Sequence, residues 1–399
     1  MLDFMANKRE SSAFLSLAFR PFFLAASLWS ALALVLWIAM LLAGVTLPSR
    51  FDPLTWHIHE MLFGFVLAAI AGFMLTAIPN WTGRLPVRGS PLAWLATLWL
   101  LGRIACLVSA LIPFWVAAVA DLSFPVILTA AVAREIAAGR NWRNLPMTLP
   151  VAVLSIADLL MYLEVGGFGV PAALGWRLGL AAIVVLISVV GGRIIPRFTS
   201  NWLAKHGTVR LPAPHRWIDR CSLGSLHAGM TGWAFLPGFR PLGMLLLLAA
   251  ALNLLRLARW RGGATLAEPL LAVLHLGYLW VLAGAALLGA AILSETVVPG
   301  SAAIHALTAG AIGTMVLAVM TRVSLGHTGR ALEASQATLL IYLLVNAAAA
   351  TRIGAAFVTG TPMILLAISG ALWVAGFSLF AAKYGPMLWS GRLQQRRTI

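Results

Sequence analysis

The sequence predicts an all-α polytopic membrane protein with about twelve transmembrane helices, on three observations. Apolar residues make up 61% of the chain and charged residues only 10%, a composition that soluble domains do not have. The apolar residues form runs close to the roughly twenty residues needed to cross the hydrocarbon layer of a bilayer. Proline recurs in the gaps between these runs, where it marks the turn from one helix to the next.

The expected spans follow one another with short connections. They are residues 22–44, 59–79, 91–112, 114–137, 147–164, 174–195, 217–237, 241–259, 267–292, 301–321, 335–357 and 362–384. Polar residues, glycine or proline interrupt the fifth and seventh. We expect one integral membrane domain over residues 1–399, in which an N-terminal segment (1–21), the longest loop (196–216) and a C-terminal tail (385–399) are cytoplasmic.

The positive charges indicate the orientation. With the N-terminus inside, 23 of the 28 Lys and Arg residues fall at alternate connections, on the cytoplasmic side, as the positive-inside rule describes. The five others are Arg50, Arg103, Arg177, Arg240 and Arg352. Both termini are therefore predicted to be cytoplasmic. The net charge of +16 is scattered over these connections and forms no patch, which argues against binding to nucleic acid.

Two stretches of the chain share a pattern. WHIHEMLFGFVLAAIAGFMLTAIPNWTGR (56–84) and HALTAGAIGTMVLAVMTRVSLGHTGR (305–330) align at an offset of 246 positions. The aligned identities are His59/His305, Gly64/Gly310, Met74/Met320 and the closing Thr-Gly-Arg. A related polar exit, GGRIIPRFTSNW (191–202), ends the sixth span. Similar exits on the second, sixth and tenth spans favour three units of four helices.

Imidazoles inside a membrane need partners, since an unpaired polar group in hydrocarbon is costly. His59 and His305 are expected at the same depth in the outer half, where they could bind opposite faces of one haem. His227 and His275, near mid-membrane, could form a copper site with His57 as a third ligand. The alternatives are hydrogen bonds to neighbouring helices and, for His57, a place in the headgroup region. The other histidines are expected in solvated inner loops: His206, His215 and His327.

A haem would also need cations beside its propionates. Arginines in the outer half are few: Arg50, Arg177, Arg240 and Arg352. Arg177 and Arg352 fall at about the depth of His59, so either could pair with a propionate. The alternative is that both extend to the outer headgroups.

Charged residues within the spans are expected to pair. Arg103 and Asp121 are level across the hairpin of the third and fourth spans, which predicts a structural ion pair, because neither charge is tolerated alone in lipid. Asp158 is an alternative partner for Arg103 or a proton-conducting group. Glu60 and Glu295 lie near the outer histidines and could orient an imidazole or supply protons.

These residues resemble a known family. The stretches 56–84 and 305–330, with GGRIIPRFTSNW and LHLGY (274–278), resemble the NnrS family over nearly the whole chain. The resemblance implies a bacterial inner-membrane protein of the nitric oxide response that contains copper and haem, expected to be of b type. The motif histidines that the resemblance carries over are His57, His59, His275, His305 and His327; His227 is added from its depth alone.

A second resemblance is architectural. Subunit I of haem-copper oxidases and nitric oxide reductases also has twelve helices in three four-helix arcs, with haem ligands on helices two and ten. His59 and His305 fall on the corresponding spans. The histidines of helices six and seven in that family have no counterpart here, so its copper site is not carried over.

Two functions from different classes remain open. The first is a haem- and copper-binding protein that binds or reduces nitric oxide near the periplasmic face, with a quinol or a cytochrome as electron donor. Whether it is an oxidoreductase is left open, and no catalytic residue is assigned. The second is a transporter or permease without a redox cofactor, for which twelve spans with buried Arg103 and Asp158 are ordinary. A scaffold without cofactors is a third reading.

Overall fold

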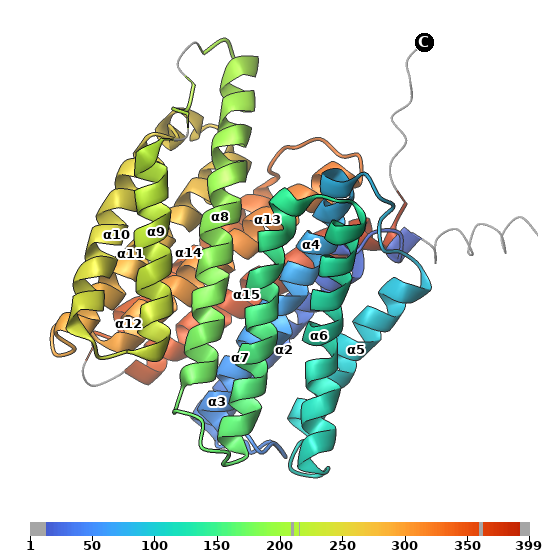
Figure 1. The fold of residues 1–399 in the computed structure, drawn as a ribbon, viewed down its shortest axis with the longest axis vertical. Helices are drawn as coiled ribbons and strands as arrows, with labels where there is room; N and C mark the ends of the chain where they lie inside the picture. Colours follow the sequence, from blue (N-terminus) through green and yellow to red (C-terminus); the bar gives the residue numbers. More distant parts are fainter. Residues whose placement is uncertain (1–12, 209–210, 215, 359–361, 392–399) are drawn as a thin grey trace, which may run out of the picture. The chain divides into compact units, whose positions relative to one another are not determined.

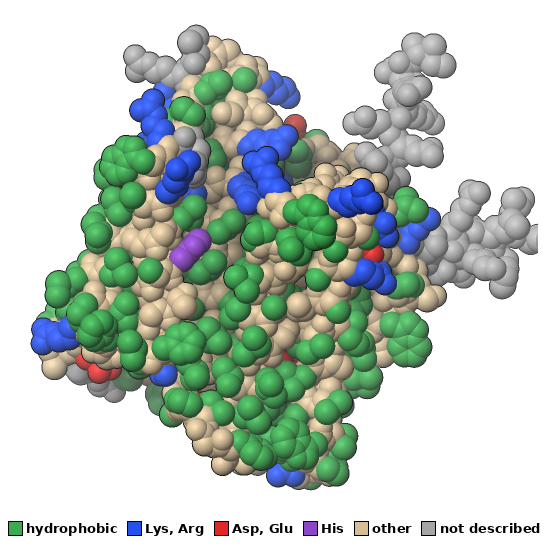
Figure 2. Space-filling view, in the orientation of Figure 1, with side chains coloured by type: hydrophobic (Ala, Val, Ile, Leu, Met, Phe, Trp, Pro, Cys, Tyr) green, Lys and Arg blue, Asp and Glu red, His purple; other side chains and the backbone are tan. Residues whose placement is uncertain are grey.

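The computed structural model describes residues 13–208, 211–214, 216–358 and 362–391 (Figure 1). In this part of the chain every regular element is helical, which confirms the all-α prediction. Eleven helices are long and apolar enough to cross a membrane. Hydrophobic side chains are spread widely over the face drawn in Figure 2, and many large ones are exposed, which suits contact with lipid. The protein is therefore a multi-pass membrane protein.

Each expected span corresponds to a helical segment. In order these are α2 (Phe19–Ala43); α3, η1 and α4 (Pro53–His59, Glu60–Val66, Leu67–Thr82); α5 (Ser90–Leu107); α6 (Phe114–Ala138); η2 and α7 (Trp142–Met147, Thr148–Val165); α8 (Leu174–Lys205); α9 (Trp217–Phe235); α10 (Arg240–Ala258); η3 and α11 (Gly262–Thr265, Pro269–Leu293); α12, η4 and α13 (Gly300–His305, Ala306–Ile312, Gly313–His327); α14 (Gln336–Ala355); and α15 (Pro362–Trp389). The seventh, α9, is outside the eleven candidate spans. Its Asp219, Arg220 and His227, with several serines and glycines, make it too polar.

The helices divide into two compact units. Unit 1 comprises residues 1–179, 320–332 and 377–399, and unit 2 comprises residues 180–319 and 333–376. In unit 1, α2 packs against α4 and η1, and α6 packs against α4, α5 and α7. In unit 2, α11 packs against α10, α12 and η4, and α9 packs against α10. The single membrane domain, the three four-helix units and the cytoplasmic termini stay predictions.

Three expected connections are more helical than the sequence suggested. α8 continues past Pro196 to Lys205, so helix occupies the first half of the predicted loop 196–216. α2 begins within the predicted segment 1–21 because Arg20 is buried and donates hydrogen bonds to the carbonyls of Met387 and Leu388. These carbonyls belong to the end of α15, where helical carbonyls lack partners in the helix itself. The expected tail therefore also begins as helix.

The repeat seen in the sequence is present in the backbone. A π-helix over residues 60–66 follows His59, and another over residues 306–312 follows His305. The two π-helices are separated by the same 246 positions as the aligned histidines. π-helices are rare and occur frequently at functional sites. The repeat is thus a repeat of an unusual backbone conformation beside a histidine.

A glycine inside each π-helix lets a tryptophan pack against the backbone. A Cβ atom at Gly64 would lie 2.6 Å from Trp29 Nε1, and one at Gly310 would lie 2.7 Å from the Trp280 ring. Each tryptophan comes from the helix that precedes the repeat, α2 in one unit and α11 in the other. No larger residue fits either position unless the indole moves.

We expect Gly310→Leu to lower the thermal unfolding temperature of the detergent-solubilised protein. Its side chain would collide with Trp280, and overpacking of this kind costs about 1–3 kcal/mol. Gly224→Leu is the matched control, because a Cβ atom at that position on α9 meets nothing within 4 Å. Both variants gain the same helix propensity, so equal unfolding temperatures would contradict the tight contact at Gly310.

Candidate metal centre

A group of polar side chains lies buried in unit 1, and we call it the His59 cluster. Its members come from α3, η1, α5, α6 and α7: His59, Glu60, Arg103, Cys106, Asp121, Asp158 and Tyr162. Each is at most 2% exposed. Ionisable groups at such burial in a membrane protein need charge partners or a bound ion.

The chain before α3 places His59 beside α5. Asp52 is the N-cap of α3, and its side chain accepts two backbone N–H groups of the first turn, with proline at the next position. Asp and proline are the preferred residues at these two places. Ser49 Oγ donates to the carbonyl of Cys106 at 3.0 Å. The start of α3 is therefore fixed to the end of α5, which brings His59 and Cys106 together.

Arg103 connects two carboxylates of the cluster. Its Nη1 donates to both carboxylate oxygens of Glu60, at 2.8 Å each, and its Nη2 donates to Asp121 Oδ1. The predicted Arg103–Asp121 ion pair is confirmed. Glu60 also accepts from Trp29 Nε1 at 2.7 Å, and Asp121 Oδ2 accepts from the Tyr162 hydroxyl at 2.9 Å.

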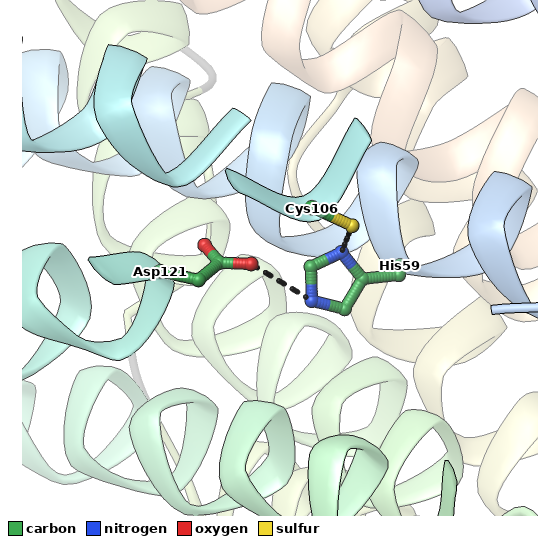
Figure 3. A group of neighbouring side chains, drawn as sticks. All are labelled: His59, Cys106 and Asp121. Atoms are coloured by element: carbon green, nitrogen blue, oxygen red, sulfur yellow. Dashed lines mark hydrogen bonds and ion pairs between the residues drawn. The ribbon is translucent and has the colours of Figure 1, made fainter. Parts of the chain in front are cut away.

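Both ring nitrogens of His59 contact other members of the cluster (Figure 3). Nδ1 lies 3.2 Å from Glu60 Oε1 and 3.5 Å from Cys106 Sγ. Nε2 lies 2.9 Å from Asp158 Oδ1 and 3.3 Å from Asp121 Oδ2. The expectation that Glu60 orients an imidazole is confirmed. Asp158 pairs with His59, whereas an ion pair with Arg103 was one of the two predicted roles.

The cluster is rich in acidic groups. Three carboxylates face one guanidinium and one imidazole, so the acidic groups outnumber the basic ones. Asp158 Oδ2 is buried and has no hydrogen-bond partner in the described structure. A buried carboxylate oxygen without a partner is costly. The site therefore has both the charge and an open acceptor for a cation.

The donor atoms suit a transition metal. One ligand atom each from His59, Cys106 and Asp121 lies within 4.8 Å of the others. Imidazole nitrogen and thiolate sulfur are donors that copper favours, and carboxylates complete such sites. Haem fits His59 less well, because an axial bond to its iron would require the imidazole to release one of its present partners. The haem shared by His59 and His305 stays a prediction.

The other predicted copper ligands each have partners within their own unit. His57 is two residues from His59, so the two rings point to different sides of α3, and His57 stacks on Trp37 at 4.8 Å. In unit 2, His227 Nε2 contacts Ser188 Oγ at 2.8 Å and His275 Nε2 contacts Thr199 Oγ1 at 3.0 Å. Ser188 and Thr199 are three turns apart on α8, about 16 Å along its axis. At this separation His227 and His275 do not share one ion.

The structure also describes the surroundings of His305 and of the two arginines predicted to pair with propionates. His305 is in unit 2, partly buried, and its Nδ1 contacts the Ser301 carbonyl at 2.8 Å. Arg352, also in unit 2, is partly buried. Arg177 donates to the Ala172 carbonyl at 3.1 Å and lies beside Trp176. Glu295 is exposed.

Two of the inner histidines can be placed. His206 is exposed and stacks on Trp202, and His327 lies 5.6 Å from the Phe19 ring. His215 is outside the described residues.

Cys106 and Tyr162 were not predicted as site residues. Cys106 is three positions after Arg103 and so lies on the same face of α5. Tyr162 is four positions after Asp158 on α7, which gives the same signal. Pairing each buried charge with its neighbours at helical spacing would have found both.

We expect Arg103→Met to destabilise the protein by about 3–5 kcal/mol, because it leaves Glu60 and Asp121 buried without their cation. Adding Glu60→Gln and Asp121→Asn to this variant should recover part of the loss. Arg134→Met is the control, since that side chain is 72% exposed and an ion pair of an exposed cation contributes little. The free energy of unfolding in detergent is to be measured for Arg103→Met, for the triple variant and for Arg134→Met. An Arg103→Met variant as stable as wild type would show that the ion pairs are not needed.

Comparison with known proteins agrees with the motifs described above. A search of curated proteins found no match. Residues 13–392 match the family model described as NnrS protein. The match covers nearly the whole described chain, including the His59 cluster and both π-helices. The chain therefore belongs to the NnrS family.

Proposed function

We propose that the protein is a bacterial inner-membrane protein of the nitric oxide response, which holds copper in the His59 cluster and a b-type haem at His305, and binds nitric oxide near the periplasmic face. Family membership supports the role in the nitric oxide response. The observation that carries the metal part is the His59 cluster, in which three buried carboxylates face one guanidinium and Asp158 Oδ2 has no partner.

Copper fits the cluster through charge and donor type. A dication would be balanced by the carboxylates, and imidazole nitrogen with carboxylate oxygen is a donor set that copper(II) accepts. Phe51 and Phe63 lie 4.9 and 5.2 Å from the His59 ring and keep it out of water. The neighbouring side chains orient the imidazole and exclude solvent, which are the protein's contributions at a metal site.

Haem fits His305 through its hydrogen bond and its place in the repeat. A carbonyl only accepts hydrogen bonds, so His305 Nδ1 donates to Ser301, and the lone pair is on Nε2. α14 begins 246 positions after α5, so Arg352 occupies the place of Cys106, which contacts His59 in the first copy. Among the described residues, no hydrogen bond or ion pair engages the Arg352 guanidinium. Arg352 would pair with a propionate, while the haem iron would supply a site for a diatomic ligand.

The metal part is tested by metal analysis of the purified protein. We expect wild type to contain copper, and His59→Ala to lose it, because His59 is the only imidazole in the cluster. His206→Ala should keep the metal, since that ring is exposed and stacks on Trp202. Protein that stays free of copper after expression and reconstitution with copper would end the proposal.

The haem part is tested by absorption spectroscopy. We expect a Soret band in wild type that is lost in His305→Ala and retained in His57→Ala. Arg352→Met should keep the band and raise the rate of haem loss. Nitric oxide should shift the band of the reduced wild-type protein. If His59→Ala were the only one of these variants to lose the Soret band, His59 would instead be favoured as the axial ligand.

Transport is the second candidate, and one observation favours it. Helices interrupted at corresponding positions of two repeats are a sign of a transporter binding site, and η1 and η4 are such a pair. Proteoliposomes that take up a solute without bound cofactors would support it.

A further inference from the structure

We propose that the metal in the His59 cluster binds on the Nε2 side of the imidazole, with Asp158 as a ligand, and that the Cys106 thiol is not a ligand. This inference rests on the proposed copper centre and specifies its ligands. The geometry presents two alternatives, because Cys106 and Asp121 lie at opposite nitrogens of one ring (Figure 3). A single ion bound to one ring nitrogen can reach the donors on that side only.

The Nδ1 side has no carboxylate free for a metal. Its carboxylate is Glu60, which receives two hydrogen bonds from Arg103 and one from Trp29. A metal ion bound on this side would have to compete with the Arg103 guanidinium for the Glu60 oxygens.

The Nε2 side has a carboxylate that only His59 engages. Asp158 Oδ1 lies 2.9 Å from Nε2, and Oδ2 of the same carboxylate has no hydrogen-bond partner. Asp121 Oδ2, 3.3 Å from Nε2, is the next donor. Two donors about 2.1 Å from one ion lie roughly 3.0–3.4 Å apart, depending on the angle. The observed separations are close to this range, so an ion could enter with little movement of the side chains.

Glu60 supports the same assignment from the other side of the ring. When Nε2 binds a metal, Nδ1 carries the proton and donates to Glu60 Oε1 at 3.2 Å. A carboxylate that accepts from the distal nitrogen of a metal-bound histidine is the usual support of such a ligand. Arg103 and Trp29 fix the carboxylate in turn. The Glu60–His59–metal arrangement therefore needs no rearrangement on the Nδ1 side.

The test measures copper binding by the full-length protein in detergent. Protein stripped with a chelator is titrated with copper(II) chloride in competition with a chelator of known affinity. We expect Asp158→Asn to weaken binding by about 100-fold or more, since even loss of a group that only supports a ligand costs 10–100-fold. Cys106→Ser should bind within about threefold of wild type. Glu135→Gln, which alters a buried carboxylate elsewhere in unit 1, is the matched control and should bind as wild type.

A second measurement keeps the test independent of folding. Asp158→Glu retains the carboxylate and should keep part of the affinity. The difference spectrum of copper-loaded and metal-free protein should lack the intense band of a copper–thiolate bond. If Asp158→Asn does not fold, retention of copper by Cys106→Ser and absence of that band support the proposal by themselves.

Three results would overturn the inference. Copper lost in Cys106→Ser, or a thiolate band in wild type, would move the metal to the Nδ1 side. Equal affinity in folded Asp158→Asn and wild type would remove Asp158 as a ligand while the copper centre stands. Wild-type protein that binds no copper would overturn the centre itself along with this assignment.

Discussion

Arg103 neutralises two carboxylates in an interior that would otherwise exclude them. Its guanidinium spans Glu60 on η1 and Asp121 on α6, so one side chain fixes the distances among three helical segments. Those distances determine where the His59 ring lies, because Glu60 follows it in the chain and Asp121 faces its Nε2. The same contacts make the region intolerant of change. A buried charge that loses its partner is far more costly than a surface charge.

Arg103 pairs with Glu60 and Asp121 but not with the third carboxylate of the cluster, Asp158. Asp158 adds a third carboxylate from α7 and has only His59 as a partner. Apolar packing gives no reason to bury this group. Within unit 1, the ion pairs of Arg103 therefore leave one carboxylate of the cluster, Asp158, without a guanidinium partner. This imbalance is the feature of unit 1 on which the proposed copper site rests.

Hydropathy was enough to predict eleven of the twelve expected spans, since it depends on residue type alone. The Arg103–Asp121 pair was predictable because both residues are similarly distant from one tight turn. The His59–Asp158 contact was not, because α3 and α7 are far apart in sequence and their approach depends on packing. The contacts of His227 with Ser188 and of His275 with Thr199 were unpredictable for a related reason. Depth in the membrane fixes one coordinate of a side chain and leaves its position around the bundle open.

The two π-helices have a consequence for how this architecture tolerates change. A π turn contains one residue more than the α turn it replaces, so it is equivalent to a one-residue insertion. Removing a residue between 60 and 66 would let the segment rewind as α-helix, which keeps the phase of the flanking helices and changes the positions of the residues within the turn. Glu60 and Gly64 are in this turn, so the contacts of Glu60 with Arg103 and of Gly64 with Trp29 would be disturbed although both partners were still present. The same applies to Gly310 and Trp280 in the second π-helix.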